Sequence, residues 1–469
     1  MDQTEIAIIG AGPTGIGAAL RLLEVGRHDF LLIDAADAPG GLASSHVDPH
    51  GFTWDLGGHV QFSHYRKFDE YMDLAFPREA WIWHERESWI WMKERFIPYP
   101  FQNNLHRLDP ADRWRAVEGL IAACAPRQIP GNFEEWIIQA FGAGIADLFM
   151  CPYNLKVWAH PLRDMDYRWV GERVAVPSLA EAMQSVCLGE DQVSWGPNRR
   201  FRFPLRGGTG AIWRALGGRI PTQNLRLAVR AEQIDPAHKT ISFSDGRKLT
   251  YETLINTAPL SWLARALGNA ELAAHSDRLK SSTVHVIGIG LKGQPPESIR
   301  KMCWIYFPET DSSFYRVTVF SNYSPNNVPS PGSTWSLMAE VAESEHLPRE
   351  SGQLVEDVVN QMVTNRLIQD PDLVISRWHT VLTPGYPTPS LDRNLILDRT
   401  LSMLQERGIY SRGRFGAWKY EVSNQDHSFM QGVEVVDNIL YGRFELTLNL
   451  PDLVNQRYNP FPYAEWEAA

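Results

Sequence analysis

Residues 6–20 read IAIIGAGPTGIGAAL, and residues 31–35 read LLIDA. An apolar run of β type leads into the pattern G-x-G-x-x-G at residues 10–15, and an Ala- and Leu-rich helical pattern follows. The second apolar run ends on Asp34, about 20 residues beyond the glycines. This order predicts the first βαβ unit of a dinucleotide-binding fold. The glycines would approach a pyrophosphate at the helix N-terminus, and Asp34 would accept hydrogen bonds from a ribose.

Two further glycine clusters follow this unit. They are PGGLAS at residues 39–44 and DLGGH at residues 55–59. Glycine pairs after the first βαβ unit fit a dinucleotide whose second half reaches well beyond the adenosine. FAD is such a molecule, and we expect it as the cofactor.

Composition and charge restrict the classes of function. The chain has 469 residues, 44% hydrophobic, which is ample for a large core and suggests two or three domains. Its net charge of −10 argues against nonspecific nucleic-acid binding. The four scattered cysteines predict free thiols, and Asp2 and Glu5 stand where a signal peptide would be basic, so we expect a cytoplasmic protein. No apolar run reaches the roughly 18 residues that a membrane span needs.

Hydrophobic periodicity predicts how the chain is organised. Residues 107–195 have helical spacing, whereas WIWHERESWIW at 81–91 and several segments after residue 266 alternate as strands do. Asp245-Gly246 signals a hairpin, and the tail ends in an amphipathic helix. We predict an α/β fold with three parts: a discontinuous Rossmann-type FAD-binding domain (1–85, 205–265 and 395–469), an inserted helical substrate domain (105–200), and an antiparallel sheet domain (86–104 and 266–394).

Long stretches of the chain resemble one known family. They include GAGPTGIGAA, PGGLAS, DLGGHVQFSHYRKFD, PYPFQNN, GIADLFMCPYNLKVWA, FPLRGGTGAIW, FYRVTVFSNYSP and SRGRFGAWKYEVSNQDHSFMQGVE. These stretches, in this order, resemble the UDP-galactopyranose mutases of eukaryotic type. The resemblance implies an isomerase that converts UDP-galactopyranose to UDP-galactofuranose. In that family, N5 of reduced FAD is the nucleophile at the anomeric carbon, and the reaction has no net redox change.

The resemblance also implies roles for individual residues. The catalytic group would be Arg173, Arg316, Arg414 and His59. Guanidinium forks suit the diphosphate of a nucleotide sugar, and a histidine near N5 could tune the flavin or relay a proton. Arg316 has the strongest case, because it lies on an apolar strand with few carboxylates nearby in sequence.

Further positions match the family's binding residues. Those for the substrate are Tyr99, Phe101, Gln102, Phe149, Tyr153, Asn154, Trp158, Asn198, Trp304, Tyr306, Tyr386, Tyr420 and Asn424. Those for FAD are Gly10, Gly12, Pro13, Thr14, Gly15, Asp34, Gly41, Leu42, Gly58, His59, Arg414, Asn424, Gln425 and Ser428. Arg86 and Ser88 match residues that bind NADPH, so NADPH or NADH would reduce the flavin. No metal site is expected.

Three alternatives stay open at this point. The protein could be a mutase for another UDP-pyranose sugar, a flavin oxidase of the amine-oxidase type, or a nucleotide-sensing module without catalysis. An apolar or amine substrate has no use for three convergent arginines, which argues against the oxidase. Assembly into a homo-oligomer is also left open.

Overall fold

The glycine motif joins the central strand of a seven-stranded sheet to the first helix. The computed structural model describes residues 2–125, 128–174, 176–193, 199–350 and 352–462. The sheet has the order β10-β11-β12-β1-β2-β9, and β18 also pairs with β12. Its strands are β1 (Asp2–Ile9), β2 (Phe30–Ile33), β9 (Leu225–Arg226), β10 (Ala231–Asp235), β11 (Thr240–Phe243), β12 (Lys248–Asn256) and β18 (Ile409–Ser411). β1 is parallel to both β2 and β12, as the βαβ prediction requires, and β11 and β12 form the hairpin expected at Asp245-Gly246.

Helices cover both faces of this sheet, because side chains alternate along each strand. Ile6 and Ile8 pack with α1, α2, α7 and α12, whereas Ala7 and Ile9 pack with α8, α9 and α11. These helices are α1 (Pro13–Glu24), α2 (Arg66–Ala75), α7 (Gly210–Gly217), α8 (Leu260–Ala266), α9 (Ala270–Ser276), α11 (Arg393–Gln405) and α12 (Gln425–Tyr441). Two short helices, α13 (Leu446–Asn449) and α14 (Pro451–Gln456), follow α12.

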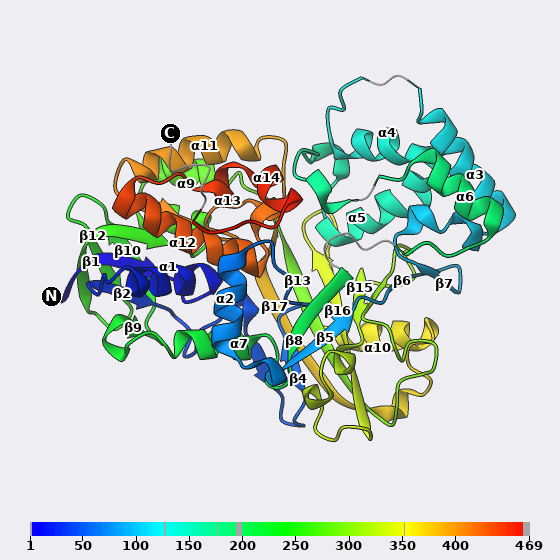
Figure 1. Cartoon of the computed structure of the whole chain (residues 1–469), viewed down its shortest axis with the longest axis horizontal. Helices are drawn as coiled ribbons and strands as arrows, with labels where there is room; N and C mark the ends of the chain where they lie inside the picture. Colours follow the sequence, from blue (N-terminus) through cyan, green and yellow to red (C-terminus); the bar gives the residue numbers. More distant parts are fainter. Residues whose placement is uncertain (1, 126–127, 175, 194–198, 351, 463–469) are drawn as a thin grey trace.

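A second seven-stranded sheet crosses the centre of the molecule (Figure 1). Its order is β17-β13-β16-β15-β14-β6-β7. The strands are β6 (Ser88–Met92), β7 (Arg95–Pro98), β13 (Ser281–Lys292), β14 (Trp304–Tyr306), β15 (Arg316–Thr318), β16 (Thr334–Glu343) and β17 (Val374–Pro387). Neighbouring strands are antiparallel, as predicted, except that β14 is parallel to β6.

The segment at 81–91 is two strands, not the single strand that its alternation predicts. β5 (Trp81–Glu85) pairs with β8 (Arg200–Pro204), and the chain then leaves for the large sheet as β6. The break at Arg86 and Glu87 has no local signal, since it depends on which distant strand each half meets. A small pair, β3 (Ser45–Val47) with β4 (Thr53–Asp55), completes the strands of the described residues.

The expected helical region forms a separate group of helices at the upper right of Figure 1. Its members are α3 (Pro110–Ala122), α4 (Phe133–Ile145), α5 (Cys151–Trp158) and α6 (Leu179–Leu188). α10 (Leu354–Thr364) packs on the second sheet, below this group. The boundaries proposed between the three domains stay predictions.

Two glycines bring the N-terminal turns of α1 and α12 together. A Cβ on Gly17 would lie 2.4 Å from the carbonyl oxygen of Phe429, and one on Gly432 would lie 2.0 Å from that of Thr14. The two helices therefore touch backbone to backbone. The glycine motif and the start of α12, at residues 424–428, consequently lie at one site.

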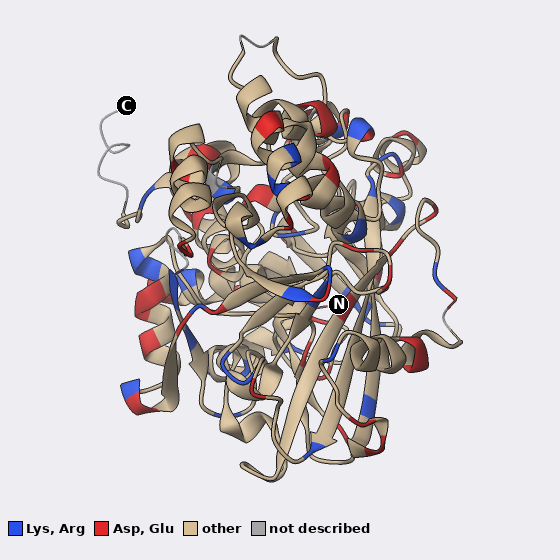
Figure 2. Cartoon of the chain, turned by 90° about the vertical axis from the view of Figure 1, so that its right-hand side faces the viewer, with Lys and Arg blue, Asp and Glu red and all other residues tan. Residues whose placement is uncertain are grey.

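Charged residues of both signs are interleaved along the outer helices (Figure 2). Within the described ranges, every helix is too short or too polar to cross a membrane.

Candidate functional site

The glycine motif makes a tight turn with one open position. Gly10 has φ +102°, and a Cβ on Gly15 would lie 1.8 Å from the carbonyl oxygen of Gly10, so both positions require glycine. Gly12 differs, because a Cβ there would meet nothing closer than 3.9 Å in the protein. No side chain caps the N-terminus of α1 at Gly12. A pyrophosphate fits this place, with the free N–H groups and the helix dipole favouring its charge.

Asp34 lies beside this turn, at the end of β2. Its Oδ2 accepts a hydrogen bond from the N–H of Ala11 at 2.5 Å, and its Oδ1 accepts from Ala36 at 2.7 Å. The carboxylate is thus held in position by the backbone. The residue is half-buried, so its carboxylate is not sealed from the surface.

Other predicted FAD residues gather around the same turn. The N–H of Gly40 donates to the carbonyl of Ala11 at 2.9 Å, and a Cβ on Gly41 would lie 3.2 Å from the Cα of Gly12. Thr14 meets the loop of Arg414, since a Cβ on Gly413 would lie 2.4 Å from Thr14 Oγ1. Pro13 is the first residue of α1, and Leu42 packs on the core beneath the sheet.

The start of α12 supplies polar groups to this region. Asn424 is the N-cap, but its side chain makes no capping bond. Gln425 Oε1 accepts from Trp213 Nε1 at 2.7 Å, and Ser428 is buried in the first turn. The first turn of α12 is therefore not capped by the Asn424 side chain, as at a helix end that receives a ligand.

The loop at residues 57–59 meets a buried carboxylate that sequence reasoning missed. Glu340 is 2% exposed, and its Oε1 accepts from the N–H of Gly58 at 3.0 Å. Next to it, burial lowers the pKa of His59 to about 4, and His59 Nδ1 has no hydrogen-bond partner among the described residues. His59 is therefore neutral at physiological pH, and its Nδ1 is buried and unsatisfied.

Arg316 is not free of carboxylates, contrary to what its sequence neighbours suggested. It pairs with Glu340 across β15 and β16, with Nε 2.9 Å from Oε1 and Nη2 2.7 and 2.8 Å from the two oxygens. Tyr315 also donates to Glu340 at 2.8 Å. Although burial opposes its ionisation, Arg316 and Tyr315 hold the pKa of Glu340 below its ordinary value. These bonds use Nε and Nη2 of Arg316, so Nη1 lies outside the pair with Glu340 and gives the guanidinium a second edge.

Arg173 and Arg414 have a different environment, since neither pairs with a carboxylate of the described residues. Arg414 donates to Ser423 Oγ at 3.0 Å and to the carbonyl of Gly385 at 3.2 Å, and its guanidinium lies 4.8 Å from the Tyr386 ring centre. Arg173 donates to the carbonyl of Glu421 and stacks 5.4 Å over Tyr420. Both arginines thus keep their positive charge for a ligand.

Aromatic side chains form two connected groups beside these arginines. The first runs Phe101–Phe149–Tyr153–Tyr306–Tyr99, with ring centres 4.9, 5.2, 5.5 and 5.3 Å apart. The second is Trp158, Tyr386 and Tyr420, with centres 4.8 to 6.0 Å apart. Members of both groups pack into the same hydrophobic core, so the two groups line one region.

Three predicted substrate residues are described without a clear place for a ligand, and a fourth is not described. Asn154 lies on α5, as expected, but its amide donates to the carbonyl of Met150 at 2.8 Å. Gln102 is 3% exposed and follows Phe101 of the first aromatic group in the same short turn. Trp304 carries a buried Nε1 without a partner among the described residues, and Asn198 lies outside those residues.

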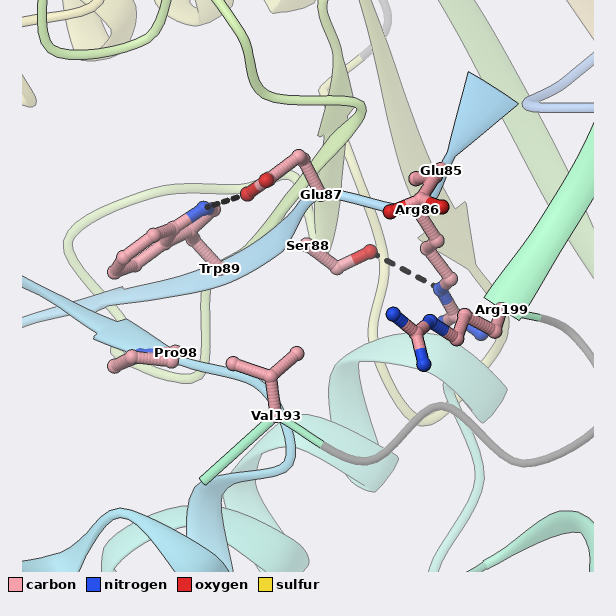
Figure 3. A pocket seen from close by; sticks show the side chains of 8 residues that line it. All are labelled: Glu85, Arg86, Glu87, Ser88, Trp89, Pro98, Val193 and Arg199. Atoms are coloured by element: carbon pink, nitrogen blue, oxygen red, sulfur yellow. Dashed lines mark hydrogen bonds between the residues drawn. The ribbon is translucent and has the colours of Figure 1, made fainter. Parts of the chain in front are cut away.

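The predicted NADPH residues, Arg86 and Ser88, line a pocket of about 240 Å³. Figure 3 shows Arg86 bonded to Ser88, with Nε 3.1 Å from Oγ, and Arg199 and Trp89 on opposite sides. Arg86 also donates to Tyr306 at 3.0 Å and lies 4.8 Å from the Trp304 ring centre. The pocket therefore adjoins the first aromatic group.

His64, Asp426 and His427 form a buried cluster that was not predicted. His64 Nδ1 lies 2.8 Å from Asp426 Oδ2, and the two imidazole rings stack 4.8 Å apart. Although burial opposes ionisation of Asp426, the two histidines lower its pKa. Potential metal-ligand atoms lie within 4.8 Å of one another here. The His64–Asp426 bond also ties the loop of His59 to the start of α12.

Comparison with known proteins adds to this geometry. The chain matches the model of the flavin-containing amine oxidoreductases over residues 13–440. A crystal structure of reduced UDP-galactopyranose mutase is 47% identical, with a TM-score of 0.94 over 97% of this chain and 98% of that one.

More distant structures share the architecture. A putative protoporphyrinogen oxidase from Exiguobacterium sp. 255-15 is 16% identical, with a TM-score of 0.71 over 93% of this chain and 98% of that one. A CLA-producing fatty acid isomerase from P. acnes is 15% identical, with a TM-score of 0.64 over 93% and 99%. These two show the fold alone. Together with the observed sheets and helices, the matches confirm the predicted α/β fold class of an FAD-binding protein.

Proposed function

Because the chain belongs to the flavin-containing amine oxidoreductases, and within them to the family of UDP-galactopyranose mutase, we propose that it isomerises UDP-galactopyranose to UDP-galactofuranose. One observation of the site carries this proposal furthest. Arg173 and Arg414 keep their charges beside the hydroxyl-bearing rings of Tyr386 and Tyr420. Two uncompensated guanidinium groups suit a diphosphate of about two negative charges.

FAD fits the residues around the glycine motif. The open side of Gly12, the uncapped start of α1 and the carboxylate of Asp34 suit its pyrophosphate and ribose. When reduced, FAD supplies the N5 nucleophile for the anomeric carbon of the sugar. The loop of Gly58 and His59 and the start of α12 would hold its ring system.

The cationic and phenolic side chains would keep the nucleotide in place. UDP leaves the sugar and must return to it, so its charge needs partners throughout the reaction. Arg173, Arg414 and the second edge of Arg316 supply guanidinium donors, and Tyr386 and Tyr420 supply hydroxyls. Because burial lowers the pKa of His59 to about 4, this residue would face the ligand as a neutral imidazole.

The first aromatic group suits the uracil ring. Phe101, Phe149 and Tyr153 present stacked faces, with the rings of Phe149 and Tyr153 only 8° from parallel. A base could stack at the end of this row while Gln102 reads its edge. The uncompensated arginines weigh against an amine substrate, since a cationic amine would be repelled.

We further propose that NADPH or NADH reduces the flavin directly, at the pocket of Arg86 and Ser88. The pocket offers a guanidinium group and a hydroxyl to a phosphate, and the flat indole of Trp89 to an adenine. In an Arg86→Leu variant, reduction by NADPH should slow at least about tenfold. Activity after reduction with dithionite should change little. Equal loss of both activities would contradict this role.

The sugar is tested with a panel of substrates. FAD-loaded protein is reduced with dithionite and incubated with UDP-galactopyranose, UDP-N-acetylgalactosamine or UDP-arabinopyranose. The proposal predicts a furanose product from UDP-galactopyranose at the highest kcat/KM. A higher kcat/KM with another UDP sugar would identify that sugar as the substrate in place of galactose. UDP binding without any furanose product would favour a binding module.

A further inference from the structure

The short segment η13 (Tyr420–Val422) holds Arg173 through its backbone. Arg173 Nη2 donates to the carbonyl oxygen of Glu421, and Asn455 Nδ2 donates to the same oxygen at 3.0 Å. The guanidinium lies 5.4 Å from the Tyr420 ring centre. A neutral carbonyl thus orients Arg173 and leaves its charge uncompensated.

The carboxylate of the same residue, Glu421, makes its hydrogen bonds to a different arginine. Both of its oxygens accept from Arg393, with Nη1 2.8 Å from Oε2 and Nη2 2.8 Å from Oε1. The pair is buried, with Arg393 2% and Glu421 7% exposed. Asn394 Oδ1 accepts from Arg393 Nε at 3.1 Å and fixes the guanidinium plane.

A buried bidentate ion pair is a weak source of stability, because desolvation offsets most of the attraction. The geometry of the pair matters more for the charge of Arg173. A buried carboxylate needs a cationic partner, and Arg173 already contacts the backbone of the same residue, Glu421. Lys419 is a further cation near Glu421. However, its Nζ donates to the carbonyl of Leu448 at 3.0 Å, and burial lowers its pKa.

We propose that Arg393 is a positioning residue that sequesters the Glu421 carboxylate, so that Arg173 keeps its full charge for the substrate diphosphate. This inference rests on the function proposed above. Without Arg393, the carboxylate would turn toward Arg173 and neutralise it. Anion binding would then weaken even though Arg173 itself is unchanged.

The experiment measures UDP binding to FAD-loaded protein by calorimetry. The variants are Arg393→Met, Glu421→Gln and the double variant. Arg21→Met is the matched control, because Arg21 forms a partly buried ion pair with Asp437 between α1 and α12. FAD content and melting temperature are recorded for each. If Arg393→Met does not fold, UDP binding is measured with the milder variant Arg393→Lys instead.

We expect Arg393→Met to weaken UDP binding at least about tenfold, and Glu421→Gln to stay within about twofold of wild type. The double variant should recover most of the loss, and Arg393→Lys should show a smaller loss that Glu421→Gln also reverses. A purely structural pair would instead weaken UDP binding equally in both single variants, with no recovery. If the wild-type protein binds UDP and Arg393→Met binds it equally tightly, this inference is overturned and the proposed function is not. No UDP binding by the wild-type protein overturns the proposed function as well.

Discussion

Glu340 and Arg316 form a buried ion pair across β15 and β16, with Arg316 Nη2 2.7 Å from Glu340 Oε1. The same carboxylate accepts a hydrogen bond from the backbone of Gly58. One side chain therefore links the loop expected beside the flavin with an arginine expected at the diphosphate. Any movement of that loop changes the surroundings of Arg316.

Replacing Glu340 by Gln should destabilise the protein, because the buried charge of Arg316 loses its partner. We expect the free energy of unfolding to fall by about 3 kcal/mol. Tyr315→Phe, which removes a single hydrogen bond to Glu340, should cost about 1 kcal/mol. Urea titration of both variants measures this difference. Equal stability of Glu340→Gln and wild type would show that the pair is dispensable.

Arg414→Met should weaken UDP binding and leave the fold intact. Its guanidinium pairs with no carboxylate of the described residues, so its removal strands no buried charge. Loss of charged hydrogen bonds predicts a tenfold to roughly hundredfold higher Kd. Arg66→Met is the control, because Arg66 is exposed and pairs with Glu70 on α2. Unchanged UDP affinity in Arg414→Met would remove this residue from the site.

Gly12→Ala should separate folding from cofactor binding. Within the protein the new methyl group would meet only ordinary contacts at 3.9 Å, so the melting temperature of the FAD-free chain should change little. The methyl group would occupy the space assigned to the pyrophosphate, and the Kd for FAD should rise at least about tenfold. Gly352→Ala, where nothing lies within 4 Å, is the control. Full FAD content in purified Gly12→Ala would mean that the pyrophosphate binds elsewhere.

His59 should make stability depend on pH. Burial lowers its pKa from 6.5 to about 4, so the unfolded chain binds more protons between these values. The free energy of unfolding of the FAD-free protein should therefore fall as pH decreases from 6.5 to about 4. Burial also lowers the pKa of His427, to about 3, and this too makes the protein less stable at low pH. His427 is present in both the wild type and a His59 variant, so its effect cancels in the comparison. His59→Gln should give a shallower slope in urea titrations across this range. Identical slopes would show that His59 is not buried in its neutral form.

The sequence predicted best those features that depend on local geometry. The turn at residues 10–15 follows from steric need, because a Cβ at Gly15 would meet the Gly10 carbonyl. The site could not be predicted as well where contacts join distant segments. Glu340 lies 24 residues from Arg316 and meets it only through strand register. Glu340, the one acid within the apolar run WSLMAEVA at residues 335–342, was nonetheless a usable signal, since a buried carboxylate needs a partner.

The parallel pair β6–β14 and the break within residues 81–91 were missed for a related reason. Alternating side chains identify a strand but not its neighbour or its direction. The roles of the individual site residues, the reductant, the oligomeric state and the cytoplasmic location stay predictions.

The central claim is that reduced FAD acts as a catalyst without being consumed as a reductant. FAD-loaded protein is incubated with UDP-galactopyranose without oxygen, once oxidised and once reduced by dithionite. UDP-galactofuranose is then quantified by chromatography. We expect many turnovers with the reduced protein while the flavin spectrum stays reduced, and no product with the oxidised protein. Equal product from oxidised protein, or no furanose from reduced protein, would contradict it.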